Sequence, residues 1–378
     1  MKRQKIKIEK ARKNEYEYIQ RFLENVYGHS RDFFWRNYPH VWLKENTDFE
    51  NTLVIREKGK IVSLVRIFPL RFVFGRARLY AGGIGAVSTD PECRGHGYMS
   101  VLMNEAIRKM ARDGYAVSAL GGDRHRYNYF GYENAGQFLS LFVDTRGLEK
   151  AGIETLPVRR YAGEQAVLRD MARCYRAHNF RLERTPADFA ALLQKLGTAV
   201  YHAGAGAKFA YAAIPQESRG SQVVEFGGDN RTLLGILKYL GGRFGGAASL
   251  GYPDFASIPP EIIKCSSGWG MNLCGMLKVI NLRKALEAYR ELLDETFPEG
   301  GAVTLQAPEA TVCLKKEKGI LHIGEGRVGD VLVLTEPELV RLLFGLAFCP
   351  PSATKPETGL LLKAIFPLPF FWWPLDHI

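Results

Sequence analysis

The stretch from Pro91 to Met110, PECRGHGYMSVLMNEAIRKM, most constrains this chain, because two glycines and an arginine stand directly before an amphipathic helical pattern. The first turn of a helix carries unpaired N–H groups and the positive end of the helix dipole, and therefore favours anions. Glycines at 95 and 97 let the backbone approach a bulky phosphate, and Arg94 adds a fixed positive charge. The stretch thus predicts a pyrophosphate-binding turn before a helix that ends near Arg112. Alternatively, the glycines only shape a tight loop between a strand and a helix.

Two familiar phosphate-binding motifs do not fit this turn. A Walker loop ends in Gly-Lys-Ser/Thr, which occurs nowhere in the chain. A dinucleotide fingerprint needs G-x-G-x-x-G in a parallel βαβ unit, and the third glycine is absent here. Both classes of nucleotide site are therefore excluded for this stretch.

The composition is that of a globular protein. A length of 378 residues predicts two or three domains, and 46% hydrophobic with 24% charged residues is ordinary for such chains. Apolar runs stay short of the ~18 residues of a membrane span, and the basic N-terminus lacks the apolar core of a signal peptide. We therefore expect a cytoplasmic protein without a membrane partner. The net charge of +11 favours anionic partners but does not distinguish nucleic acid, a phosphorylated cofactor and an acidic surface.

The cysteines are scattered, without a Cys-x-x-Cys pair or paired histidines nearby. This pattern predicts reduced, mostly buried thiols rather than a disulfide framework, and no metal site. The cysteines are Cys93, Cys174, Cys265, Cys274, Cys313 and Cys349.

The order of helical and strand patterns predicts an α+β chain. Helical patterns over 14–28 and from Ser30 to Trp42 precede alternating segments between 52 and 89, and the helix after Gly97 is followed by further strands to about 150. This predicts a mixed, mostly antiparallel sheet covered by helices.

The segment GIGAVSTDPECRGHGYMSVLMNEAI, residues 83–107, resembles the acyl-CoA signature of the GNAT acetyltransferase superfamily. That signature is a strand ending in Val, then Pro-x-x-Arg-Gly-x-Gly and a helix; its usual final Gly or Ala is Met99 here. The resemblance implies a GNAT fold, acetyl-CoA as acyl donor and no metal. It assigns cofactor binding to Val87, Thr89, Arg94, Gly95, His96, Gly97, Tyr98 and Met99.

The next motif, RHRYNYFGYENAG at 124–136, resembles the Tyr-x-x-Phe-Gly-Tyr turn of the Eis-like (enhanced intracellular survival) branch of that superfamily. The resemblance extends along the chain and implies an acyl-CoA-binding GNAT domain at 1–150 and a degenerate GNAT-like domain at 151–270. A sterol-carrier-protein-like domain would follow at 271–378, where GMLKVINLRKALEAY and VLVLTEPELVRLLFG resemble that module. It also implies a homo-oligomer, a trimer or hexamer.

The same resemblance assigns Tyr127 as the general acid toward the leaving thiolate. With a phenol pKa of ~10 and a thiol pKa of ~8.5, full transfer from an unperturbed tyrosine is uphill by about 2 kcal/mol. Tyr127 is therefore better described as a hydrogen-bond donor to sulfur. The alternative is that it is only a packed aromatic residue.

The resemblance also points to the C-terminal carboxylate, at Ile378, as a base or cation-orienting group. A carboxylate of pKa ~3.5 lies about 9 kcal/mol from an amine of pKa ~10, so we expect it to orient an ammonium or to pass a proton through water. Alternatively the tail FFWWPLDHI is a hydrophobic plug, and docking the plug would also place Ile378.

Other polar residues near these motifs are expected to contribute less. We expect a bystander role for two residues beside the terminus and at most a part in shaping the substrate mouth for a charged loop before Tyr127. These residues are Asp376 and His377, and Asp123, Arg124 and His125.

Three functions remain open at this point. The first is an acetyl-CoA-dependent N-acetyltransferase for a primary amine of aminoglycoside, polyamine or lysine type. The second is a tRNA-dependent aminoacyl transferase with tandem GNAT units, which would not need the turn from Arg94 to Gly97; nucleic acid is thus an unlikely partner. The third is a CoA-sensing or lipid-binding scaffold without turnover.

Overall fold

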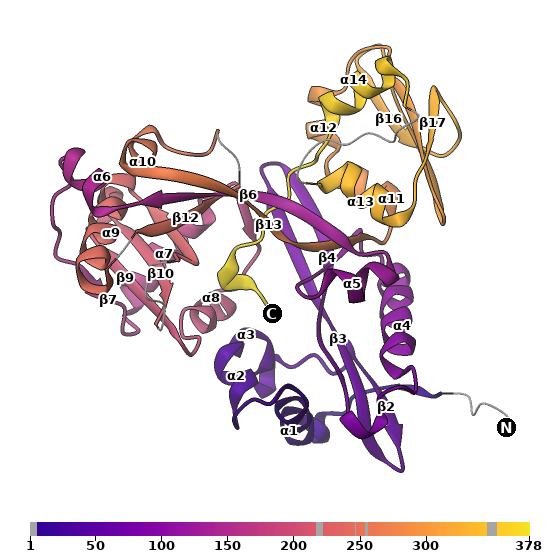
Figure 1. Cartoon of the computed structure of the whole chain (residues 1–378), viewed down its shortest axis with the longest axis horizontal. Helices are drawn as coiled ribbons and strands as arrows, with labels where there is room; N and C mark the ends of the chain where they lie inside the picture. The colour runs from indigo at the N-terminus through magenta and orange to yellow at the C-terminus, as the bar shows by residue number, and fades with distance from the viewer. Residues whose placement is uncertain (1–5, 217–221, 246, 254–255, 346–353) are drawn as a thin grey trace.

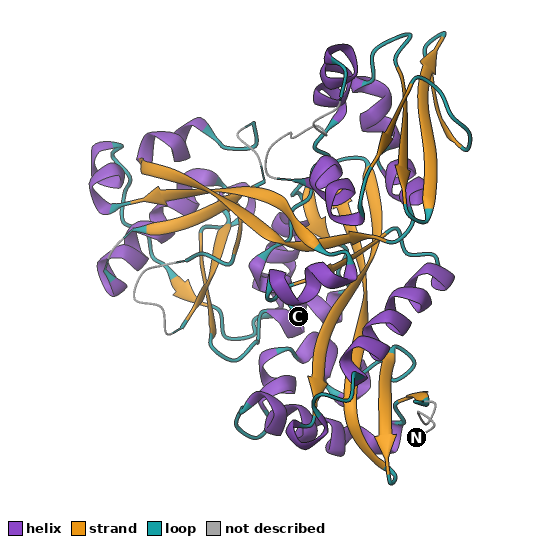
Figure 2. Ribbon diagram, turned by 45° about the vertical axis from the view of Figure 1, so that its right-hand side comes forward, coloured by secondary structure: helices purple, strands orange, loops and turns teal. Residues whose placement is uncertain are grey.

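The computed structural model describes residues 6–216, 222–245, 247–253, 256–345 and 354–378, and within them the strands form three sheets (Figure 1). The first sheet has nine strands, and the second and third have four each. Helices pack on all three sheets (Figure 2). Cys349 lies outside the described residues; of the other cysteines, Cys93 is half-buried, the rest are buried, and all are free thiols, as predicted.

The first sheet is antiparallel except where β4 pairs with β5. In spatial order it contains β1 (Ile8–Lys10), β2 (Thr52–Glu57), β3 (Lys60–Phe74), β4 (Ala77–Thr89), β5 (Val117–Leu120), β13 (Ser266–Val279), β6 (Glu133–Val143) and β12 (Ala248–Tyr252). The short β8 (Phe180–Leu182) pairs with β3 off this path. The predicted mixed, mostly antiparallel sheet is confirmed.

The other sheets belong to the later parts of the chain. The second has the order β11 (Glu225–Gly228), β10 (Ala210–Pro215), β9 (Thr198–Ala203) and β7 (Arg159–Arg160). The third has the order β16 (Ile320–Gly324), β15 (Ala310–Glu317), β14 (Ala302–Ala307) and β17 (Asp330–Val333). The predicted boundary between 270 and 271 falls inside β13, which pairs with β5 and β6, and β8 likewise joins the first sheet from beyond residue 150.

The helices that precede residue 151 are α1 (Tyr16–Tyr27), α2 (Phe33–Asn37), α3 (Pro39–Trp42), α4 (Tyr98–Asp113), α5 (Arg124–Tyr127) and α6 (Thr145–Lys150). They lie on both faces of the first sheet, with α1, α2 and α3 on one face and α4 on the other, while α6 packs against α9 (Asn230–Phe244) and α10 (Pro260–Cys265). Helix α1 ends at Gly28, as expected, with φ 70°. The single helix expected from Ser30 to Trp42 is instead α2 and α3, because Pro39 keeps the preceding Tyr38 out of helical geometry, at φ −134° and ψ 56°.

The later helices are α7 (Gln165–Arg176), α8 (Pro186–Leu192), α9 (Asn230–Phe244), α10 (Pro260–Cys265), α11 (Leu282–Ala288), α12 (Arg290–Thr296), α13 (Glu336–Phe344) and α14 (Pro356–Ile365). Of these later helices, α7 and α9 pack on the second sheet, α11 and α12 on the third, and α13 on β6 and β13 of the first. Short 3-10 turns occur at 13–15, 44–46, 91–93, 128–130, 206–208 and 374–376. Among the described residues, no helix combines the length and the apolar character needed to cross a membrane.

Helix α4 packs on the first sheet through one apolar stripe. Leu102, Met103, Ala106 and Met110 are buried and recur at helical spacing. On the sheet side Gly82 has no room for a side chain, since a Cβ there would lie 2.3 Å from the sulfur of Met110. This close packing fixes the helix axis, and with it the first turn of α4.

The C-terminal tail follows α14 and runs into the centre of the molecule, where the end of the chain lies close to α8 and α3 in Figure 1. Phe370, Phe371, Trp372 and Trp373 are each at most 5% exposed. The tail is therefore part of the core, as the plug hypothesis requires.

Candidate active site

Strands β4 and β5 separate in the middle of the first sheet. They pair in parallel only from Ala81 to Gly83, after which β4 continues to Thr89 without β5 beside it. In the same segment the register with β3 shifts, leaving Ala86 and Val87 opposite a single residue, and Ala86 has φ 53°. Such a bulge leaves backbone groups outside the ladder. The bulge thus leaves backbone amides outside the ladder just before the predicted anion-binding turn, while the carbonyls of Ala86 and Val87 accept hydrogen bonds from side chains.

The turn has the geometry that its sequence predicts. Gly95 and Gly97 adopt φ values of 83° and 78°, and nothing lies within 4 Å of a Cβ placed on either residue. Glycine is required here by the left-handed backbone and not by lack of space. Gly97 is the N-cap of α4 and has no side chain to bond the amides of the first turn, and the Arg94 side chain is exposed.

A cavity of about 610 Å³ lies against this turn. Its lining includes most of the residues predicted to bind cofactor: Val87, Thr89, Arg94, Gly95, Gly97, Tyr98 and Met99. His96 does not line it; its ring is exposed, with Nδ1 4.0 Å from Oε1 of Glu57. The structure therefore brings the predicted set together except for His96.

Met99, which replaces a small residue of the signature, is accommodated without closing the cavity. It packs against the apolar cluster beneath α4 and also lines the cavity. Tyr98 is held nearby, because its hydroxyl bonds to the carboxylate of Glu57 at the end of β2.

The cavity also contains residues that the sequence analysis missed. Tyr27, the last residue of α1, donates a hydrogen bond of 2.8 Å to the carbonyl of Val87, and Val26, Ser88, Cys93 and Arg126 complete the wall. No local motif marks Tyr27, because it reaches the bulge from a helix far away in sequence.

Tyr127 ends α5 beside this wall. Its side chain is 7% exposed, its ring lies 6.3 Å from that of Tyr132 in an edge-to-face contact, and a Cβ on Gly122 would be 2.7 Å from Cε2 of Tyr127. Burial raises the pKa of Tyr127, against a smaller opposing effect of Arg126. The phenol therefore stays protonated and can donate, but it is a weaker acid than tyrosine in water.

A second cavity, of about 520 Å³, contains the C-terminus. Ile378 lines it, and the Cδ1 atom of Ile378 would lie 2.7 Å from a Cβ on Gly83. Gly83 is the last residue of β4 that pairs with β5. The chain therefore ends where these strands separate.

The charges around this second cavity have both signs. Asp48, Glu183 and Asp188 line it together with three arginines. Arg184 is neutralised by Glu225 and Asp376, with N–O distances of 2.5 and 2.7 Å. Arg66 bonds to the carbonyl oxygens of Val41 and Asn46 and lies over the rings of Trp42 and Phe68, while Arg71 is exposed.

The structure corrects one expectation for the tail and specifies another for the loop before Tyr127. Asp376 is not an exposed bystander, since it is 3% exposed and paired with Arg184; His377 is exposed. Asp123 caps α5 by accepting from the amide of His125, and Arg124 bonds to Glu133. Among the described residues, no three His, Cys, Asp or Glu side chains are grouped to hold a metal ion.

Comparison with known protein families gives a match to the part of the chain that contains the anion-binding turn. Residues 7–135 match the model of the acetyltransferase (GNAT) domain. The matched region contains the separated strands, the bulge, the turn and Tyr127. No curated protein matches the chain.

Solved structures share the fold over nearly the whole chain. A GCN5-related N-acetyltransferase from Kribbella flavida is 18% identical with a TM-score of 0.72, covering 99% of this chain and 100% of that one. A GCN5-related N-acetyltransferase from Anabaena variabilis is 20% identical with the same TM-score and coverage. Eis1 from Mycobacterium abscessus is 13% identical with a TM-score of 0.68, covering 98% and 100%. The GNAT-type multidomain α+β fold is thus established beyond the GNAT domain.

Proposed function

We propose that this protein is an acetyl-CoA-dependent N-acetyltransferase that acts on a primary amine. The observation that carries the proposal is that the end of the chain and the cavity of the anion-binding turn lie along the same strand, β4. The C-terminus contacts β4 at Gly83, and the cavity of the anion-binding turn begins a few residues later, at Val87. A thioester held along β4 would therefore lie between the turn and the C-terminal carboxylate.

The proposed donor site uses the backbone more than side chains. Amides of the turn and the first turn of α4, with Arg94, would hold the pyrophosphate. Amides near the bulge at Val87 would bind the thioester oxygen and stabilise the oxyanion that forms on attack.

The proposed reaction requires two proton movements. The amine nitrogen attacks the thioester carbon, the C–S bond breaks, and the hydroxyl of Tyr127 donates a hydrogen bond to the departing sulfur. The proton lost by the amine would pass to solvent through water oriented by the carboxylate of Ile378, and the thiolate would take up its proton from solvent. The acids of the second cavity, Asp48, Glu183 and Asp188, would attract a cationic acceptor of aminoglycoside, polyamine or lysine type.

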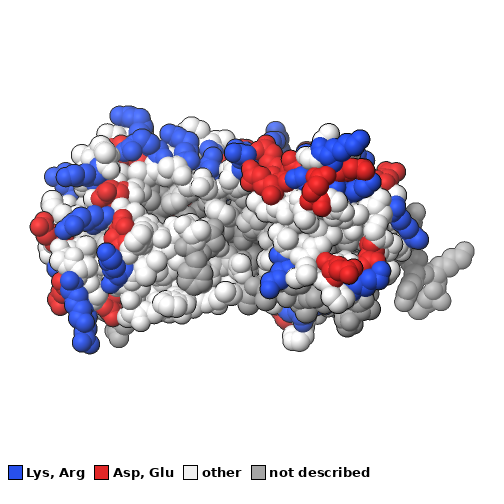
Figure 3. Space-filling view, turned by 90° about the horizontal axis from the view of Figure 1, so that it is seen from above, with Lys and Arg blue, Asp and Glu red and all other residues white. Residues whose placement is uncertain are grey.

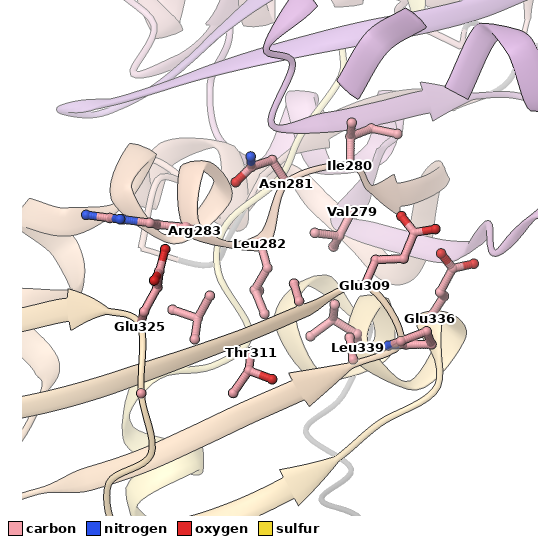
Figure 4. A pocket seen from close by; sticks show the side chains of 15 residues that line it. Val279, Ile280, Asn281, Leu282, Arg283, Glu309, Thr311, Glu325, Glu336 and Leu339 are labelled. Atoms are coloured by element: carbon pink, nitrogen blue, oxygen red, sulfur yellow. The ribbon is translucent and has the colours of Figure 1, made fainter. Parts of the chain in front are cut away.

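Neither alternative function gains support from a specific feature. On the face shown in Figure 3, basic and acidic side chains lie side by side, without the continuous basic stripe expected of a tRNA-binding surface. A cavity of about 680 Å³ lies between β13, α11 and the third sheet, but Arg283, Glu309, Glu325 and Glu336 project around it (Figure 4). A lipid-binding scaffold would need an apolar cavity.

The proposal is tested by mixing the protein with acetyl-CoA and a panel of primary amines while following release of free thiol. We expect release that saturates with at least one amine. If acetyl-CoA binds but no amine accelerates thiol release, the protein is a CoA-binding scaffold instead.

The position of the terminus gives a first prediction. Gly83→Ala places a methyl group where the end of Ile378 and the side chain of Leu70 now lie, so the terminus must move. We expect kcat to fall about tenfold or more, since misplacing a reacting group by about 1 Å can cost 10²-fold, while the Kd of acetyl-CoA stays unchanged. Gly242→Ala is the matched control, because a Cβ there meets nothing within 4 Å. Unchanged turnover in Gly83→Ala would remove the carboxylate from the mechanism.

The pH dependence gives a second prediction. A tyrosine loses its hydroxyl proton above its pKa, and burial raises the pKa of Tyr127 above the usual value of ~10. We therefore expect kcat with a saturating amine to show no decrease from phenol ionisation up to about pH 10. A decrease between pH 8 and 9 that is lost in Tyr127→Phe would show that this pKa is lowered instead.

A further inference from the structure

The tail is held in two different ways along its length. From Phe370 to Trp373 it is packed among apolar side chains, with the indole of Trp373 donating a 2.9 Å hydrogen bond to the carbonyl of Phe180. After Trp373 the chain forms a short 3-10 turn, Pro374–Asp376, where Leu375 is still buried and polar contacts are added to the apolar ones. The residues that supply these polar contacts, Arg184 and Lys195, are far from the tail in sequence.

The first of these contacts is an ion pair inside the protein. Arg184, which follows β8, donates from Nε to Oδ1 of Asp376 at 2.7 Å and from Nη2 to Oε2 of Glu225 at 2.5 Å. The side chains of all three residues are at most 3% exposed. Tyr211 donates to the other oxygen of Glu225 at 2.9 Å. Because buried charges are tolerated only when they are well partnered, this network gives Asp376 one favourable position.

The second contact lies closer to the end of the chain. Lys195, just beyond α8, donates from Nζ to the carbonyl of Leu375 at 2.8 Å and to that of His377 at 3.2 Å. The carbonyl of His377 belongs to the peptide bond that leads into Ile378. Lys195 therefore holds the last peptide plane, while the Ile378 side chain packs near Gly83 and Leu70.

Packing continues beyond Trp373, since Leu375 is buried and the ring of His377 lies 5.0 Å from that of Trp372. The side-chain hydrogen bonds to the last carbonyls, however, come from Lys195.

We propose that Lys195 and Arg184 are positioning residues that fix the carboxylate of Ile378 beside the separated strands β4 and β5. They act through the tail and need not touch donor or acceptor. Chain ends fray unless they are tied down, and a group used in catalysis must be held in one geometry. This inference rests on the proposed acyl transfer. The attachment of the C-terminus by Lys195 and Arg184, here called the tie, can be measured without it.

The tie is measured by digestion with a carboxypeptidase, followed by intact mass. Lys195→Met removes the ammonium, keeps an unbranched stem and leaves no buried carboxylate unpaired. We expect Ile378 to be released about tenfold faster than from the wild type, because two hydrogen bonds from a charged donor are lost. Lys238→Met is the matched control, since Lys238 also donates to a backbone carbonyl, that of Ile153 at 2.7 Å, away from the tail. Equal release from all three proteins would overturn the proposal.

The catalytic consequence is measured by combining Lys195→Met with a glycine added after Ile378, which moves the carboxylate. We expect each change alone to lower kcat about tenfold, with the KM for acetyl-CoA unchanged. If Lys195 acts through the carboxylate, the combined protein is no slower than the extended one. If the decreases in kcat from the two changes multiply in the combined protein, Lys195 acts elsewhere. A wild-type kcat for Lys195→Met would overturn its role.

Arg184 is tested through its partner, since removing the arginine would leave two buried carboxylates unpaired. Asp376→Asn keeps the shape of the side chain and weakens the ion pair. We expect faster release of Ile378 and a lower kcat, with the KM for acetyl-CoA unchanged, and a wild-type release rate would overturn the role of Arg184. If the wild type transfers no acyl group but still protects Ile378, the proposed function fails while the tie stands.

Discussion

Replacing Tyr127 by Phe is expected to lower kcat about 100-fold, because loss of one positioned hydrogen-bond donor to a developing negative charge costs roughly 10²–10³ in kcat. The Kd of acetyl-CoA should change by less than about twofold, since Tyr127 is buried beside the cavity and is absent from its lining. The ring would keep its edge-to-face contact with Tyr132, so packing is preserved and only the hydroxyl is lost. Steady-state kinetics and a binding titration separate the two effects.

Tyr129→Phe is the matched control for this experiment. Tyr129 lies in the same turn but is 81% exposed, so loss of its hydroxyl should not alter kcat. If Tyr127→Phe turns over as fast as the wild type, Tyr127 is a packed aromatic residue and sulfur leaves without its help.

Reversing the charge of the turn should abolish cofactor binding. Wild-type protein at about 100 times the Kd of acetyl-CoA should gain about 2.7 kcal/mol of stability and show a higher melting temperature. Arg94→Glu replaces a charge-assisted contact to phosphate by repulsion, so we expect the Kd to rise at least about 100-fold and the shift to vanish. Its melting temperature without acetyl-CoA should stay unchanged, because the Arg94 side chain is exposed.

Arg160→Glu provides the control for the change in net charge. Arg160 is exposed in β7, so this variant should keep the full shift. A full shift in Arg94→Glu would place the pyrophosphate elsewhere, and no shift in the wild type would remove both acyl transfer and CoA sensing.

Features built from neighbouring residues could be predicted from the sequence. The turn from Arg94 to Gly97 and the start of α4 follow from glycine conformations, helix-terminus electrostatics and apolar spacing, all of which are local. The division into α2 and α3 also has a local cause in Pro39, although the sequence analysis predicted one helix there.

Features that depend on distant contacts could not be predicted. Asp376 looked like a polar residue on a free tail, and its burial depends on Arg184 and Glu225, which are far away in sequence. Tyr27 likewise reaches Val87 only because α1 packs at the end of β4. Side-chain type and spacing carry no information about such pairs when the partner lies in another part of the chain.

The central claim is that an acetyl group passes from CoA to an amine beside β4, between the anion-binding turn and the C-terminus. The most direct test supplies acetyl-CoA with an isotope-labelled acetyl group and the best amine from the panel, and locates the label by mass spectrometry. We predict the label on the amine nitrogen in amounts equal to the thiol released, with little product from Tyr127→Phe. Thiol release with the label recovered as free acetate, or equal product from both proteins, would contradict the claim.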